Sequence, residues 1–194
     1  MATSRLIVAI AGGSGAIYGV RALEAVQRLR SVETHAIVTR AGAKALVAET
    51  GHTARKLTRI ADVVHDASER APPTFATRID TLGLLVAPCS VETLRAIADE
   101  DNTDLVARAA EACLTEGHRV VLLLPEARLE LTTIQLMAKA TRLGTVIMPP
   151  VPAFYHRPAS LDDIVDQTVG RALDLFDIEA GLVRRWTEGD RPRP

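Results

Sequence analysis

Short apolar runs alternate along this chain with longer segments of helical periodicity. The first run, Leu6–Ala11, contains no polar residue, which is typical of a strand buried on both faces. The next segment has the spacing of one helix face, with apolar residues at Ala16, Val20, Leu23, Val26 and Leu29. Strands of this kind joined by amphipathic helices form a parallel sheet with helices on both sides. The sequence therefore predicts an α/β fold, a Rossmann-like, three-layer, doubly wound parallel sheet in a single domain.

The same alternation continues to a final long helix, which Ser160 is expected to cap. Five further strands are predicted at His35–Thr39, Ala61–His65, Leu82–Ala87, Arg119–Leu124 and Thr145–Met148. Helices are predicted at Ala41–Glu49, from Val91 through Ala98, at Thr103–Glu116 and at Leu131–Leu143. The 194 residues suit one domain, which we assign to residues 1–189, followed by a flexible tail at 190–194.

Composition and charge exclude several classes of function. The formal net charge is −1, so the chain has no large positive field for nucleic acid or an anionic membrane. No apolar run approaches the roughly 18 residues of a membrane span. Cys89 and Cys113 form no CxxC pair and have no nearby histidine at ligand spacing, which favours buried free thiols over a disulfide or a zinc site. We therefore expect a cytoplasmic protein that binds neither nucleic acid nor membrane.

A glycine-rich turn, residues 12–15, follows the first strand. Its glycines let the backbone turn tightly and approach a ligand, while the next helix begins with free N–H groups at the positive end of its dipole. A phosphate or another anion is expected there, with the Ser14 hydroxyl as an added donor; a close-packed turn without a ligand is the alternative. The spacing is G-x-G-x-x-x-G, and Glu33 lies at the wrong end of the second strand to bind a ribose. The pattern therefore favours a mononucleotide phosphate over NAD.

Several longer segments resemble the UbiX-type flavin prenyltransferases. Residues 12–19 are similar to the GASGAIYG sequence of that family, residues 88–94 to its PCSxxTL sequence, and residues 143–158 carry its FYHRP segment. Glu49 stands where the family has an acid after the second strand, and Arg108–Ala110 resembles the family's RAAD stretch. Arg171 and the pair Arg185-Trp186 also fit, so the resemblance spans almost the whole chain.

The resemblance implies that the chain transfers a dimethylallyl group from dimethylallyl monophosphate to reduced FMN, without a metal, to make prenylated FMN for a partner decarboxylase. The implied catalytic residues are Ser14, Glu49, Tyr155 and Arg171, of which Tyr155 and Arg171 would hold the prenyl phosphate. The implied FMN-binding residues are Gly12, Gly13, Ser14, Thr39, Ser90, Val91, Glu92, Thr93, Arg108 and Glu126. The resemblance also implies a homo-oligomer, up to a dodecamer, whose subunits share sites. Without the motifs, Tyr155 could equally be a core aromatic residue and Arg171 a surface cation.

The chain departs from the family pattern in four places. Either Pro125 or Glu126, depending on the register, stands where the family has the arginine of a Pro-Arg-Glu segment, and Thr115 replaces a lysine. Asp99-Glu100 replaces an Asn-Gly pair, and residues 73–77 replace an Ala-Ser-Gly-Ser loop. Each lost phosphate contact is worth roughly 1.5–3 kcal/mol, so we expect weak phosphate binding. Two alternatives therefore stay open: a flavin-holding carrier or pseudo-enzyme of the same fold, and a flavin-dependent decarboxylase.

Overall fold

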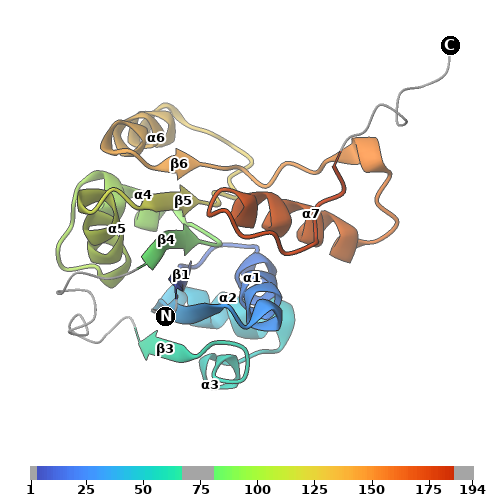
Figure 1. Ribbon diagram of the computed structural model, residues 1–194. Coiled ribbons are helices and arrows are strands. Elements are labelled where there is room, and N and C mark those ends of the chain that lie inside the picture. Colours follow the sequence, from blue (N-terminus) through green and yellow to red (C-terminus); the bar gives the residue numbers. More distant parts are fainter. Residues whose placement is uncertain (1–3, 67–80, 186–194) are drawn as a thin grey trace, which may run out of the picture.

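The computed structural model describes residues 4–66 and 81–185 and contains one six-stranded sheet (Figure 1). All strands are parallel, in the order β3-β2-β1-β4-β5-β6, so the strand order reverses between β1 and β4. The strands are β1 (Ser4–Ile10), β2 (Val32–Val38), β3 (Val63–Asp66), β4 (Thr81–Val86), β5 (Arg119–Leu122) and β6 (Val146–Ile147). The prediction of a doubly wound parallel sheet is confirmed.

Seven α-helices and one 3-10 turn connect or follow the described strands (Figure 1). They are α1 (Ala16–Leu29), α2 (Arg40–Thr50), α3 (Ala54–Leu57), α4 (Val91–Ala98), α5 (Leu105–Thr115), α6 (Leu131–Leu143), η2 (Phe154–His156) and α7 (Leu161–Asp174). The single-turn helices α3 and η2 were not predicted, because three or four residues are too few to show helical periodicity. The tail proposed at 190–194 and the loop at 73–77 lie outside the described residues.

Strand β1 separates two apolar cores. Leu6, Val8 and Ile10 pack on one face with side chains of α1, α2 and α7. Ile7 and Ala9 pack on the other face with side chains of α4, α5 and α6. All five side chains are fully buried. This two-sided burial is the reason that the first strand contains no polar residue.

The cap predicted at Ser160 is present at the start of α7. The Ser160 hydroxyl accepts a hydrogen bond from the Asp163 N–H at 3.2 Å, and the Asp163 carboxylate accepts one from the Ser160 N–H at 3.0 Å. These reciprocal bonds form a capping box at the start of α7.

Cys89 and Cys113 are buried free thiols, and burial raises the pKa of Cys113 to about 12.

Residues 4–66 and 81–185 contain neither a membrane-spanning helix nor a cluster of metal ligands. None of their helices combines the length and the apolar composition needed to cross a bilayer. Within the same ranges, 4–66 and 81–185, no three His, Cys, Asp or Glu side chains are grouped so that they could hold a metal ion.

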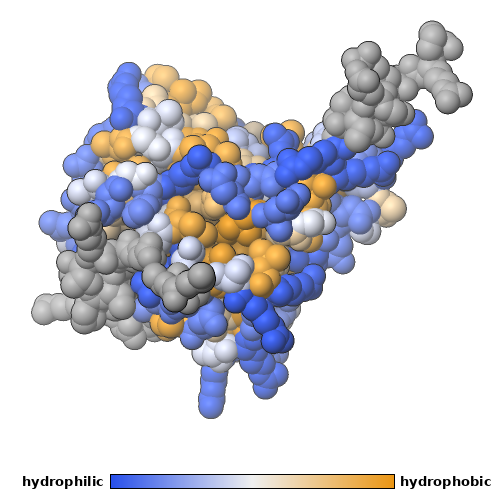
Figure 2. Space-filling model, viewed as in Figure 1, coloured by the Kyte–Doolittle hydropathy of each residue, from blue (hydrophilic) through white to orange (hydrophobic). Residues whose placement is uncertain are grey.

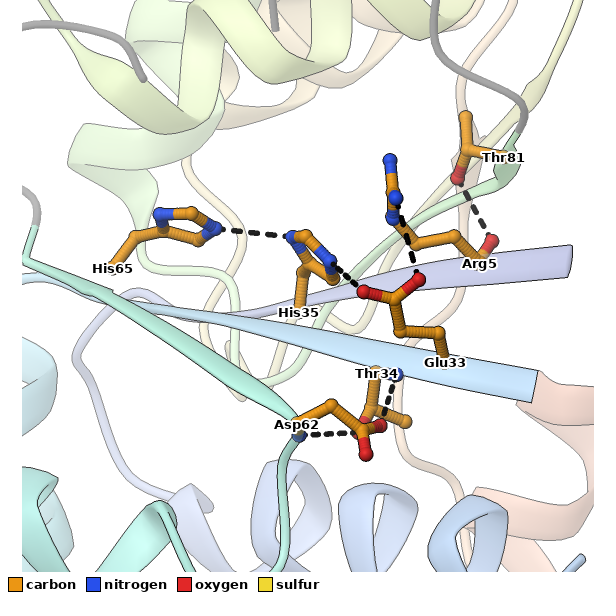
Figure 3. Close-up of polar contacts among 7 residues, drawn as sticks. All are labelled: Arg5, Glu33, Thr34, His35, Asp62, His65 and Thr81. Atoms are coloured by element: carbon orange, nitrogen blue, oxygen red, sulfur yellow. Dashed lines mark hydrogen bonds and ion pairs between the residues drawn. The ribbon is translucent and has the colours of Figure 1, made fainter. Parts of the chain in front are cut away.

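A chain of polar contacts connects β1, β2 and β3, with His35 and His65 buried and Arg5 and Glu33 partly exposed (Figure 3). The Arg5 guanidinium lies 3.3 Å from the Glu33 carboxylate, which in turn lies 2.9 Å from Nε2 of His35. Nδ1 of His35 lies 3.1 Å from Nε2 of His65. A carboxylate can only accept, so neutral His35 carries its proton on Nε2 and accepts from His65 through Nδ1. Burial lowers the pKa of His35, and the hydrogen bond to Glu33 partly opposes that shift.

The His35 shift predicts a loss of stability in acid. The unfolded chain takes up a proton near the usual histidine pKa of about 6.5, whereas folded His35 takes it up only at lower pH. The free energy of unfolding should therefore fall between pH 7.5 and pH 5.5, above the range in which Glu33 titrates, as urea denaturation would measure. His35→Gln should flatten this dependence and the control His118→Gln should not. Equal slopes for wild type and His35→Gln would contradict the assignment.

Candidate functional site

Three loops meet at the carboxyl ends of β1, β2 and β4. The Ala11 N–H donates to the Pro88 carbonyl at 3.1 Å, which joins the loops after β1 and β4. The Thr39 N–H donates to the Ile10 carbonyl at 3.1 Å, which joins the ends of β2 and β1. The buried Thr93 hydroxyl reaches the Ala11 carbonyl at 3.4 Å. The three loops are thus held together where the strand order reverses, the usual ligand-binding place in a doubly wound sheet.

The glycines of the turn have different roles. Gly12, Gly13 and Gly15 all have positive φ, at +87°, +78° and +100°. A Cβ added at Gly12 would lie 2.7 Å from the Cβ of Ala41, so Gly12 is required by close packing. A Cβ at Gly13 would meet nothing nearer than the Cβ of Ser90, at 4.0 Å. The close-packed turn therefore explains Gly12, whereas Gly13 leaves one side of the backbone open to a ligand.

The Glu49 carboxylate binds the start of α1. Its Oε2 accepts hydrogen bonds from the Gly15 N–H at 2.9 Å and the Ala16 N–H at 2.8 Å. A phosphate or another anion was expected at these helix-start donors, and in this chain two of them bind a carboxylate of α2. Binding of a flavin phosphate by the neighbouring groups stays a prediction. Ser14 and Gly13 remain exposed beside the carboxylate. Glu49 lies in the last turn of α2, more than 30 residues from the glycine turn along the chain.

The turn before α4 contributes the second wall of the site. The Ser90 hydroxyl accepts from the Thr93 N–H at 3.2 Å and so caps α4, while it lies 3.2 Å from the Thr93 hydroxyl. The N–H groups of Val91 and Glu92 lie in the first turn, where a helix has no internal acceptor for them. The Glu92 side chain is exposed. The backbone of this turn is therefore the part that can contact a ligand.

A cavity of about 1170 Å³ extends from Thr39 toward β3. Thr39 itself is half-buried, and its hydroxyl caps α2 by accepting from the Gly42 N–H at 3.0 Å. The cations Arg40, Lys44 and Arg55 line the cavity. They place positive charge in the cavity that Thr39 lines, although the chain as a whole is nearly neutral.

Tyr155 and Arg171 form a second cluster, around α7. Arg171 is exposed and lines a cavity of about 280 Å³ between β6, the proline-rich loop and α7. Tyr155 is 46% exposed, and its hydroxyl contacts Gln167 at 3.1 Å. Gln167 lines the same cavity and lies one helical turn before Arg171. The structure therefore brings the two residues predicted to hold a phosphate to the same part of α7.

The remaining site residues are not brought together in this chain. Arg108 is half-buried within α5. Glu126 is exposed after β5, and its carboxylate accepts from the Arg128 N–H at 3.2 Å. Thr115 ends α5 just before β5 begins, at the amino end of the sheet and away from the glycine turn. Arg185 pairs with Asp174 at 3.0 Å, and Trp186 lies outside the described residues.

Two polar contacts were missed by the sequence analysis. The contact of Glu49 with the start of α1 joins segments that are distant in the sequence, so no local sequence pattern predicts it. Gln167 is 3% exposed, and it was not selected because a single glutamine in an amphipathic helix resembles a surface residue. A buried position in the apolar stripe of α7 is the signal that could have identified it.

Comparisons with known proteins agree with this geometry. Residues 1–178 match the Flavoprotein family. The chain is 42% identical over 183 residues to flavin prenyltransferase UbiX of Thauera aromatica, covering 94% of both chains. It is 45% identical over 184 residues to the protein of the same name from Escherichia coli K12, covering 94% of this chain and 97% of that relative.

Solved structures with the same fold are also similar in sequence. AnUbiX (PadA1), in complex with FMN and dimethylallyl pyrophosphate, has a TM-score of 0.91 and 38% identity, covering 95% of this chain and 97% of that one. A dodecameric FMN-dependent UbiX-like decarboxylase from Escherichia coli O157:H7 has a TM-score of 0.89 and 36% identity, covering 94% of this chain and 99% of that one.

The Glu49 contact predicts a measurable contribution to stability. Glu49→Ala leaves two N–H groups of α1 without their acceptor and should lower the free energy of unfolding by about 1 kcal/mol, the usual cost of losing a helix cap. Glu49→Gln keeps an acceptor oxygen and should cost less. Glu111→Ala, at an exposed position of α5, is the matched control. Equal urea midpoints for Glu49→Ala and Glu111→Ala would show that the contact contributes nothing.

Proposed function

Because this chain belongs to the UbiX-type flavin prenyltransferase family, we propose that it transfers a dimethylallyl group from dimethylallyl monophosphate to reduced FMN. The observation that carries the proposal is the arrangement at the strand-order reversal. There an open glycine backbone, an anchored carboxylate and the first turn of α4 surround one space. The exposed Tyr155 and Arg171 supply the phosphate-binding chemistry that the same reaction requires.

The residues present fit a flavin phosphate. Gly13 has no side chain and no close neighbour, so a flat ring could lie against the backbone there. Backbone groups of the Ser90 turn could contact its polar edge, and the cations beside Thr39 favour an anionic end. Bound FMN would supply the electron-rich ring that accepts the prenyl group. The remaining FMN-binding assignments, Arg108 and Glu126, rest on the family resemblance.

Glu49 and Ser14 would act at the flavin edge. The two backbone N–H groups fix the Glu49 carboxylate in one position, where it could accept or return a proton or stabilise positive charge on the allyl group. The Ser14 hydroxyl is exposed next to it and could donate to the flavin. The bonds from the Gly15 and Ala16 N–H groups hold the Glu49 carboxylate beside the glycine turn that carries Ser14, so both residues belong to one proposed site.

Tyr155 and Arg171 would hold the leaving phosphate. In the transfer, the C–O bond of the allylic phosphate breaks and the electron pair leaves with the phosphate oxygen. A phenol hydroxyl and a guanidinium stabilise that oxygen by charge-assisted hydrogen bonds. Where the family has an arginine after the fifth strand, this chain has Pro125 or Glu126, and neither supplies a positive charge. This loss should raise KM for the donor more than it lowers kcat.

We propose that the glycine-turn site of one subunit combines with the Tyr155 and Arg171 cluster of another subunit. Within one chain, β6 lies three strand positions from β1, roughly 14 Å across the sheet. The segment with η2 projects beyond the sheet beside α7 (Figure 1) and exposes Val151 (70%), Phe154 (69%) and Leu161 (80%). Figure 2 shows further apolar surface over α6 and β6, where Leu131 and Ile134 are exposed. Such apolar surface suits contact with another copy of the chain.

A flavin carrier or pseudo-enzyme is the second candidate, and the absence of the family's arginine at Pro125 or Glu126 is the observation that favours it. If the chain is instead a prenyltransferase, a partner decarboxylase would consume the prenylated flavin. A cytoplasmic location is part of the proposal, and the buried, unpaired Cys89 and Cys113 support a reducing compartment.

Anaerobic incubation with reduced FMN and excess dimethylallyl monophosphate should yield a flavin heavier by one five-carbon unit, as mass spectrometry would detect. Glu49→Gln should suppress the product. Gly13→Leu should abolish FMN binding and transfer, because its side chain would enter the open space beside Ser90. Gly117→Leu is the matched control, since Gly117 has a φ of +76° and no atom within 4 Å of an added Cβ. FMN binding without any adduct at millimolar donor would leave the carrier as the function.

The shared site predicts an oligomer whose exposed loop matters for transfer. Light scattering at micromolar protein should give a mass several times that of one chain. Phe154→Asp should lower both the mass and the transfer rate, because it places a charge in the apolar contact. Leu29→Asp, at the end of α1 and 38% exposed, should change neither. A monomeric mass for the wild type would contradict sharing between subunits.

A further inference from the structure

Hydrogen bonds join the buried side chain of Gln167 in α7 to Tyr155 and Arg184. Its Oε1 accepts from the Arg184 N–H at 2.8 Å. Its Nε2 donates to the Tyr155 hydroxyl oxygen at 3.1 Å and reaches the Arg184 carbonyl at 3.4 Å. The Tyr155 hydroxyl donates to the same carbonyl at 3.2 Å. The side chain of Gln167 is therefore bonded at both ends in a position that is 3% exposed.

These contacts determine the orientation of the amide. A backbone N–H can only donate, so the oxygen of the Gln167 amide must face Arg184 and the nitrogen must face Tyr155. The nitrogen has no lone pair for the tyrosine proton, so that proton cannot point toward Gln167. It can point to the Arg184 carbonyl or to an acceptor on the open side of the phenol, where Tyr155 is 46% exposed.

We infer that Gln167 is a positioning residue that directs the Tyr155 proton to a phosphate oxygen of the substrate. When a phosphate oxygen binds, the hydroxyl turns from the Arg184 carbonyl to the anion. That carbonyl then keeps the Gln167 Nε2–H as a donor, so it is not left unpaired. Gln167 thus lowers the cost of switching the proton. The inference rests on the proposed function only in taking Tyr155 as a ligand of the prenyl phosphate.

Two substitutions separate positioning from packing. Gln167→Met has a similar length but no hydrogen-bonding groups, so the Tyr155 proton should stay on the Arg184 carbonyl. Gln167→Glu keeps the acceptor for Arg184 but replaces the donor to Tyr155 with a second acceptor that would take the tyrosine proton. Val169→Ala is the control for general damage to α7, because Val169 is 1% exposed and packs in the apolar core instead.

The measurement is the Kd for dimethylallyl monophosphate, by calorimetry on protein loaded with oxidised FMN, followed by KM and kcat for transfer under reducing conditions. Gln167→Met should raise Kd and KM about tenfold, equivalent to about 1.4 kcal/mol, and change kcat less. Gln167→Glu should raise them further. Val169→Ala should lower thermal stability and leave Kd unchanged. In the Tyr155→Phe background, Gln167→Met should add no further loss, because the hydroxyl through which it acts is gone.

The outcomes distinguish the inference from the proposed function. Donor binding that depends on Gln167 without any transfer would support the inference and overturn the prenyltransferase proposal. Equal Kd values for wild type and Gln167→Met would overturn the inference alone. A Gln167→Met effect that persists undiminished in Tyr155→Phe would also overturn it. Absence of donor binding by the wild type would overturn both.

Discussion

Strand β1 has neither an exposed face nor a free edge. It pairs with β2 on one side and β4 on the other, and alternate residues enter the two apolar cores. The strand order reverses beside it, so the helices that follow β1 and β4 pack on opposite faces of the sheet. The position of the glycine turn, and of every group that surrounds it, therefore follows from the burial of this one strand.

The polar groups around that turn are largely satisfied before any ligand binds. Glu49 pairs with the first N–H groups of α1, and Ser90 and Thr93 pair with each other and with the end of β1. Groups held in this way need little reorganisation when a ligand arrives. The groups left open include the Gly13 backbone, the Ser14 hydroxyl and the first N–H groups of α4. The site is thus a rigid frame with a few free contacts.

The same principle applies on α7. Gln167 is a buried polar residue in a helix that otherwise contributes apolar side chains such as Val169 and Leu173 to the core. Its three hydrogen-bonding contacts join α7 to the Tyr155 loop and to Arg184. A buried amide with fewer partners would be destabilising. Its complete pairing explains how an exposed loop that carries Tyr155 keeps a defined position beside Arg171.

The order and type of the main elements, the two-sided burial of β1 and the glycine turn could all be predicted from the sequence. Apolar periodicity and positive-φ glycines are local properties, because they depend on residues that are neighbours in the sequence. The predicted helix Leu131–Leu143 matches α6 residue for residue, whereas β6 shrinks to two residues before Pro149 and Pro150, which cannot donate to a ladder. The contact of Glu49 with the helix-start donors and the contact of Gln167 with Tyr155 could not be predicted from the sequence. The tertiary structure also separated the glycine turn from the Tyr155 cluster. Those relations depend on how helices distant in the chain pack against the sheet, and no local spacing encodes that packing.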